Sequence, residues 1–244
     1  MDVAERACEL ECVQGTNKHE FVGPVKIILL DPPPGEYRRR KWGSAGLSAV
    51  MFLMGAVFFI VFVFTLKFTL KLGINLHVFL CTIGLQLFVP AGILMHNRLF
   101  GAAAQLTLLD RKCQHVCLEF FGLITAVGGA AIMALLEFDS LKPTVHSILG
   151  AVSLVFMVFN LLIGPTVFCT NPAKAYGQFN RQAHIIFGLP GYIFATACFI
   201  TGLMKESFSS WAVVKYLHYI VIALTVLYSL IVFASVRFRS RSPQ

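Results

Sequence analysis

The sequence predicts an all-α fold, a bundle of six transmembrane helices, from its composition and from the spacing of its apolar segments. Hydrophobic residues make up 57% of the 244 residues, charged residues make up 13%, and the mean hydropathy is +0.76. A soluble domain of this size is far less apolar. Six apolar segments follow one another, each near the ~20 residues that cross about 30 Å of hydrocarbon as a helix. Membrane lipid is therefore expected to surround most of the chain.

The first element is expected to be a cytosolic tail over residues 1–44. Its composition is polar, and the run Asp-Pro-Pro-Pro-Gly at 31–35 interrupts regular structure. The tail contains no continuous apolar stretch, so the first membrane helix, rather than a cleavable secretory signal, is expected to direct insertion. Cys8 and Cys12 lie close together in it, but no second Cys/His pair at zinc spacing accompanies them. A zinc site in the tail is therefore not favoured.

Six transmembrane helices then form one domain over residues 45–237, and a short basic tail, 238–244, ends the sequence. The expected helix ranges are 46–66, 74–95, 115–136, 146–168, 184–204 and 213–236. An even number of spans places both termini on the same side of the membrane. Near the helix ends, twelve Lys and Arg residues lie on the side of the termini and five lie on the other. By the positive-inside rule, both termini are expected to be cytosolic.

These basic residues also explain the formal net charge of +8 as helix-end anchoring at an anionic membrane surface, so no nucleic-acid partner is expected. The side of the termini carries Arg38, Arg39, Arg40, Lys41, Arg98, Arg111, Lys112, Lys174, Arg181, Arg237, Arg239 and Arg241. The other side carries Lys67, Lys71, Lys142, Lys205 and Lys215.

Four histidines stand near the starts of the second to fifth helices: His77, His115, His146 and His184, separated by 38, 31 and 38 residues. Because successive helices are antiparallel, His77 and His146 are expected near the non-cytosolic face, and His115 and His184 near the cytosolic face. A lone histidine at a helix end is usually an interfacial or packing residue. Four histidines in register on four consecutive helices favour ligation of a cofactor.

Two facing imidazoles inside a helical bundle supply both axial ligands of a haem. The two pairs therefore predict a dihaem core in helices two to five, with irons on the order of 20 Å apart. Bis-histidine ligation leaves no open position for oxygen, so the predicted activity is electron transfer. His77 and His96 share a helix at a spacing of nineteen residues, unlike the 13 or so of respiratory cytochromes b. The alternative function is a six-helix transporter or scaffold without haem, and bound haem distinguishes the two.

Four glycines share the helix faces of these histidines, and two interpretations stay open for them. Gly150 and Gly188 follow a histidine by four residues, and Gly84 and Gly122 follow one by seven. Glycine at these places either clears room for a porphyrin ring or allows close helix packing.

The remaining polar residues in the helices receive no chemical role. Glu119 lies one turn after His115 and is expected to reach the interface, where a carboxylate is tolerated better than in the bilayer centre. Gln86, Asn160 and His218 are expected to make hydrogen bonds between helices, and His96 is given no function.

Several motifs resemble the cytochrome b-561 family, transmembrane reductases with one haem ligand on each of helices two to five. The resemblance covers roughly residues 46–236. Its motifs are Asn75-Leu76-His77, Lys112-Cys113-Gln114-His115, His146-Ser147-Ile148-Leu149-Gly150, His184-Ile185-Ile186-Phe187-Gly188 and Thr201-Gly202-Leu203-Met204-Lys205-Glu206. Val78 and Ile148 depart from the proline and tryptophan usual in the family at these places.

The resemblance implies two haems b, with His115 and His184 holding the cytosolic one and His77 and His146 the other. It further implies a reductase that oxidises cytosolic ascorbate and reduces monodehydroascorbate or a ferric chelate on the opposite face. Lys112 and Arg181, each three residues before a cytosolic ligand, match basic residues that the family keeps for the ascorbate anion; positive-inside anchoring explains them equally well. The family also implies a homodimer. Secretory vesicle, lysosome, endoplasmic reticulum and plasma membrane are all compatible with the sequence.

Overall fold

The computed structural model describes residues 34–66, 70–138, 143–169, 174–212, 214 and 216–239. The predicted tail up to residue 33, with Cys8 and Cys12, lies outside the described residues. Lys67, Lys142, Lys215 and the residues from 240 onward, with Arg241, lie outside them too. All regular elements in the described part are helices, and six of them are long and apolar enough to cross a membrane. The predicted six-helix transmembrane bundle is confirmed.

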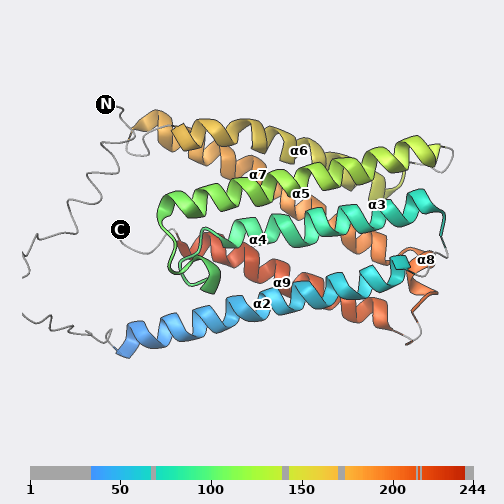
Figure 1. The fold of residues 1–244 in the computed structure, drawn as a ribbon, viewed down its shortest axis with the longest axis horizontal. Coiled ribbons are helices and arrows are strands. Elements are labelled where there is room, and N and C mark those ends of the chain that lie inside the picture. The colour runs from blue at the N-terminus through green and yellow to red at the C-terminus, as the bar shows by residue number, and fades with distance from the viewer. Residues whose placement is uncertain are drawn as a thin grey trace, which may run out of the picture. The chain divides into compact units, whose positions relative to one another are not determined.

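The elements, in chain order, are α2 (Pro34–Leu66), α3 (Leu72–Thr82), the π-helical turn η1 (Ile83–Phe88), α4 (Val89–Leu94), the 3₁₀ turn η2 (Gly101–Ala103), α5 (Leu108–Leu136), α6 (Val145–Cys169), α7 (Ala175–Leu203), α8 (Glu206–Ser209) and α9 (Leu217–Arg239). The segments α3, η1 and α4 run on as one span, Leu72–Leu94. The six spans lie side by side and alternate in direction (Figure 1).

The two ends of the bundle differ in charge. We call the end where α2 begins and α9 ends the basic end; its described basic side chains are Arg38, Arg39, Arg40, Lys41, Arg98, Arg111, Lys112, Lys174 and Arg181. At the opposite end the described basic side chains are Lys71 and Lys205. Lys71 donates to Glu137 Oε2 at 2.9 Å, so one of these two charges is balanced by a carboxylate.

Three helices begin earlier than the apolar segments predict, always at the basic end. α2 starts at Pro34, so residues 34–44 are helical and not part of a tail. Proline is tolerated in the first turn because its missing N–H would have no partner there. α5 starts at Leu108 behind Thr107, whose hydroxyl accepts a hydrogen bond from Asp110 N at 3.2 Å. Hydropathy marks the hydrocarbon-crossing part of a helix, whereas capping sets its true end.

The earlier starts correct the depth of two histidines. α7 begins at Ala175 instead of residue 184, and α5 at Leu108 instead of residue 115. His184 and His115 therefore lie about two turns inside their helices, at 3.6 residues per turn. Both side chains therefore lie away from the first turn of their helices.

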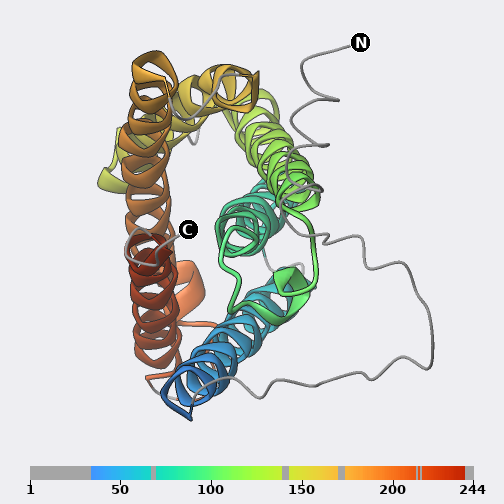
Figure 2. The same cartoon turned by 90° about the vertical axis from the view of Figure 1, so that its left-hand side faces the viewer.

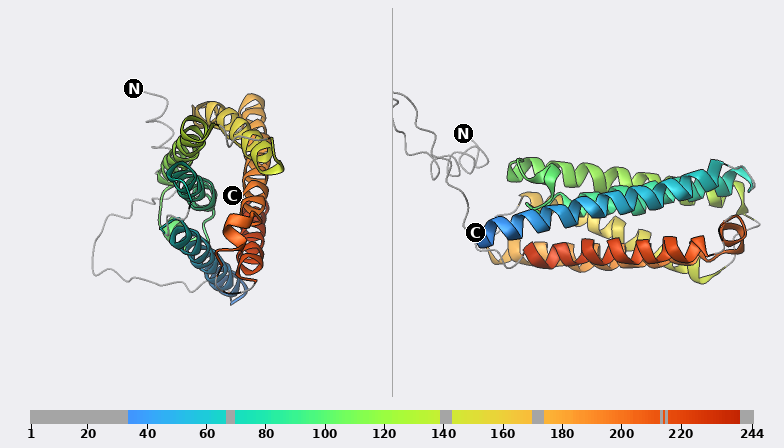
Figure 3. Two further views of the ribbon diagram at one scale, coloured as in Figure 1. Left: turned by 90° about the vertical axis from the view of Figure 1, so that its right-hand side faces the viewer. Right: turned by 90° about the horizontal axis from the view of Figure 1, so that it is seen from below.

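The spans pack as two close pairs, with the α3–η1–α4 span along α5 and α6 along α7, while contact between α5 and α6 is much sparser. Seen along the helix axes, α5, α6 and α7 follow one another around the bundle, and α2 and α9 lie on the other side (Figures 2 and 3). Ser153 of α6 donates to the Gly191 carbonyl of α7 at 2.9 Å.

Glycine makes this close packing possible. A Cβ at Gly84 would lie 2.5 Å from the Gly122 carbonyl oxygen of α5, and one at Gly122 would lie 3.0 Å from Val89. A Cβ at Gly150 would lie 3.2 Å from Cys198 Sγ, and one at Gly188 would lie 2.8 Å from Asn160. All four glycines thus face a neighbouring helix, which supports close packing over room for a ring.

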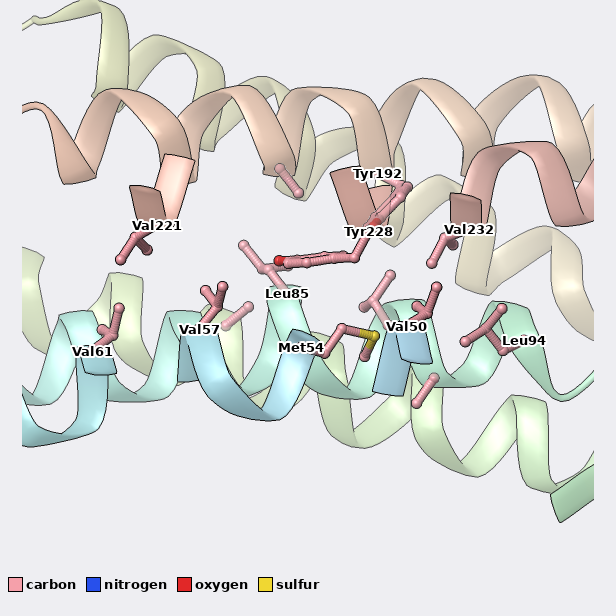
Figure 4. Packing of buried hydrophobic residues seen from close by; sticks show 14 of the residues in the cluster. Val50, Met54, Val57, Val61, Leu85, Leu94, Tyr192, Val221, Tyr228 and Val232 are labelled. Atoms are coloured by element: carbon pink, nitrogen blue, oxygen red, sulfur yellow. The ribbon is translucent and has the colours of Figure 1, made fainter. Parts of the chain in front are cut away.

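The hydrophobic core joins α2 and α9 to the two pairs. Val50, Met54, Val57 and Val61 repeat at the spacing of one helix face and are at most 1% exposed. They point towards α9, where Val221, Tyr228 and Val232 are buried too (Figure 4). Tyr228 donates to Gln86 Oε1 at 2.6 Å, and Gln86 donates to the Ala195 carbonyl at 3.3 Å. The predicted packing role of Gln86 is confirmed.

Candidate functional site

The four predicted histidines form two interhelical pairs, each joining the two close helix pairs. The ring centres of His77 on α3 and His146 on α6 lie 6.2 Å apart, with ring planes at 82°. Those of His115 on α5 and His184 on α7 lie 6.0 Å apart, at 81°. His115 and His184 lie towards the basic end, and His77 and His146 towards the opposite end. The pairing is the one that the antiparallel order of the helices requires.

Hydrogen bonds fix the ring orientation of three of these histidines. Nδ1 lies 3.1 Å from the Gly129 carbonyl for His77, 3.0 Å from the Gly92 carbonyl for His115 and 2.9 Å from the Cys198 carbonyl for His146. A carbonyl only accepts, so each Nδ1 donates and carries the proton. The lone pair of each ring is then on Nε2, the nitrogen available to a metal.

The fourth histidine is held differently. His184 Nδ1 is buried and makes no hydrogen bond of good geometry, although it interacts with the backbone of Asn160 on α6. Gly188, one turn further along α7, packs directly on the Asn160 side chain. The contact between Gly188 and Asn160 therefore keeps α6 close behind the His184 ring.

The spacing of the pairs fits bis-histidine haem. Two imidazoles that bind one iron from opposite sides place their ring centres about 6 Å apart, because the metal–nitrogen bond is about 2 Å long and the nitrogen lies about 1 Å from the ring centre. The separations of 6.2 and 6.0 Å agree with this value. Within the described residues no three His, Cys, Asp or Glu side chains gather as metal ligands; a haem needs only two from the protein, since its porphyrin supplies four nitrogens.

The sequence did not indicate several side chains that flank the pairs. Cys81 Sγ lies 3.6 Å from His77 Nδ1, and Cys198 Sγ lies 3.5 Å from His146 Nδ1. Glu119 Oε1 lies 3.6 Å from His115 Nδ1, so Glu119 turns towards His115 and does not reach the interface as expected. The ring of His96 lies 4.4 Å from that of His115. Cys81 and Glu119 follow their histidines by four residues, a helical spacing that would have predicted both contacts.

The two candidate ascorbate residues lie one turn closer to the basic end than His115 and His184. Lys112 lies with Nζ 5.5 Å above the Phe168 ring of α6, and Arg181 is exposed on α7. Each precedes a facing histidine by three residues, so each lies on the same helix side as its histidine. Arg111 is 4% exposed and bonds the Thr107 carbonyl at 3.4 Å, which adds a buried cation beside Lys112.

Together, the six antiparallel spans and the two histidine pairs define a multi-pass membrane protein with interhelical sites suited to haem. The family model for eukaryotic cytochrome b561 matches residues 76–210, more than half of the sequence and all four paired histidines. The chain belongs to the cytochrome b561 family. No curated protein sequence matches it closely.

Membership in this family implies a general function. Cytochromes b561 are transmembrane oxidoreductases that bind haem b and transfer electrons across the membrane, and the chain is an integral membrane protein of this kind.

Proposed function

We propose that the chain holds two haems b, one between His115 and His184 and one between His77 and His146, and conducts electrons from cytosolic ascorbate to an acceptor on the opposite face. The observation that carries the proposal is the pair of ring separations, 6.0 and 6.2 Å. A haem held by either histidine pair would supply one-electron chemistry between ferric and ferrous iron.

The donor assignment rests on charge at the basic end. Ascorbate is an anion at neutral pH, and Lys112 and Arg181 supply cationic donors one turn outside the His115–His184 pair. An anion held there lies beside the ligand pair of that end. The concentration of basic side chains at this end also supports the predicted membrane orientation, in which the basic end and both termini are cytosolic. The acceptor would be monodehydroascorbate or a ferric chelate, and the resemblance favours a homodimer as the assembly.

An absorbance spectrum of purified protein, recorded before and after addition of ascorbate and with haem counted per chain, tests the proposal. We expect two haems per chain and a b-type spectrum that ascorbate reduces. His115→Ala and His146→Ala are each expected to lose one haem, whereas His218→Ala, in α9 and outside both pairs, retains two.

The possible outcomes separate the parts of the proposal. Absence of haem would leave the transporter or scaffold function in its place. Haem that ascorbate does not reduce would remove the donor site at Lys112 and Arg181 while keeping the ligand assignment. Retention of two haems in both ligand variants would contradict the assignment of the four histidines.

A further inference from the structure

In the α3–α5 helix pair, the two histidines have similar surroundings that differ in one side chain. His77 of α3 donates to the Gly129 carbonyl of α5, and His115 of α5 donates to the Gly92 carbonyl of α4. Four residues after each histidine, a side chain approaches its Nδ1 at 3.6 Å: the Cys81 thiol beside His77 and the Glu119 carboxyl beside His115. The two ends of this pair thus have the same arrangement, with a thiol at one end and a carboxyl at the other.

Packing holds the carboxyl group of Glu119 in this position. A Cβ at Gly92 would lie 2.9 Å from Glu119 Oε1, so the carboxyl group lies directly over the backbone that accepts the His115 hydrogen bond. The corresponding Cβ at Gly129 would lie 2.9 Å from Cys81 Sγ. The Glu119 side chain is 18% exposed, and its Oε1 lies 3.6 Å from His115 Nδ1.

Among the described residues, thiols take the place of the carboxyl beside the pair at the opposite end. The thiols of Cys81 and Cys198 lie 3.6 and 3.5 Å from the two Nδ1 atoms there. Lys205, just after the end of α7, is an exposed cation at this end of the bundle. It follows one turn after Gly202, where a Cβ would lie 3.1 Å from His146 Cε1. The two pairs therefore differ in one flanking group: a carboxyl lies beside His115, whereas thiols lie beside His77 and His146.

We infer that Glu119 is a positioning residue for His115 that makes the haem at the basic end harder to reduce than the haem at the opposite end. An electron-rich oxygen beside Nδ1–H makes the imidazole a stronger electron donor, and a stronger donor stabilises ferric over ferrous iron. A thiol does this more weakly. At equilibrium the electron resides preferentially at the end opposite the basic end, which favours transfer away from the cytosol.

This inference rests on the proposed function, because it requires two haems on these four histidines. The test is redox potentiometry of the purified holoprotein, following the absorbance of reduced haem in native protein and in Glu119→Gln. The native titration is expected to show two one-electron components, and the lower one is assigned by its loss in His115→Ala. Glu119→Gln keeps the size of the side chain, so the expected change is confined to that component.

In Glu119→Gln we expect the equilibrium constant for reduction of the lower component to rise about tenfold, which corresponds to about 59 mV for one electron. Glu119→Asp, which retains the acid on a shorter side chain, is expected to give a smaller shift and serves if the glutamine variant fails to fold. Cys81→Ala, at the matching position, should leave the lower component unchanged.

An unchanged lower component in both Glu119 variants would overturn the inference, and so would a shift confined to the upper component. If His115→Ala removes the upper component instead, the assignment of the lower potential to the basic end is overturned. A native protein without two components would overturn the proposed function, and this inference with it.

Discussion

Substitution of Gly84 by alanine is expected to push apart the helix pair on which two of the proposed haem ligands stand. An added Cβ would lie 2.5 Å from the Gly122 carbonyl oxygen, 2.5 Å from Thr125 Oγ1 and 3.1 Å from Ala126 N. Contact becomes ordinary at 3.4 Å, so η1 and α5 must separate by about 0.9 Å at this point. The carbonyl oxygen and the amide nitrogen are backbone atoms, and neither can rotate away.

The expected destabilisation is that of an overpacked core, about 1–3 kcal/mol. In a chain of this size each kcal/mol lowers Tm by about 2–4 °C. Separation of the helices also lengthens the two reciprocal hydrogen bonds, 3.1 Å from His77 to Gly129 and 3.0 Å from His115 to Gly92. We therefore expect loss of haem as well as a lower Tm.

The measurement is thermal unfolding of the detergent-solubilised protein together with haem counted per chain. Gly128→Ala on α5 is the matched control, because a Cβ there has nothing within 4 Å. Both variants gain the same helix propensity from alanine, so the difference between them isolates the contact. If Gly84→Ala and Gly128→Ala unfold at the same temperature and bind equal haem, the reasoning about close packing is refuted.

Three further substitutions test the core and the donor site. Tyr228→Phe removes the hydrogen-bond donor to buried Gln86 Oε1 and should lower the free energy of unfolding by about 1–3 kcal/mol. Tyr219→Phe is the control, because Tyr219 is 57% exposed; equal stability of the two variants would contradict a stabilising role of the hydrogen bond. Lys112→Ala and Arg181→Ala should each raise the ascorbate concentration needed for half-maximal reduction and make that concentration less sensitive to salt. Haem content should stay unchanged. If the ascorbate concentration dependence is unaltered, the donor site lies elsewhere.

The fold class and the number of spans were readable from the sequence because both depend on local composition. A run of about 20 apolar residues must be helical in lipid, where every backbone N–H and C=O needs a partner within the segment. The register of His77, His115, His146 and His184 was readable for the same reason, since helix order and direction alone decide which residues share an end. Helix starts were less predictable: α5, capped by Thr107, begins seven residues before the apolar segment that predicted it.

The surroundings of the histidines depended on contacts between residues far apart in the chain. The carbonyl acceptors of His77 and His146 each lie 52 residues away from their donors, and no local pattern indicates such a partner. The role of the glycines was likewise undecided until their neighbours were known. Only the packed structure showed that Gly84 faces Gly122 and that Glu119 packs against Gly92.

The sequence by itself thus determined that the chain crosses the membrane six times and that its histidines fall at two depths. The tertiary structure decided which groups touch the rings: carbonyls that fix Nδ1 of His77, His115 and His146, thiols at one end and a carboxyl at the other. The physical reason is that transfer into lipid depends on each segment alone, whereas the charge and hydrogen bonding around a ligand depend on how neighbouring helices are turned against one another.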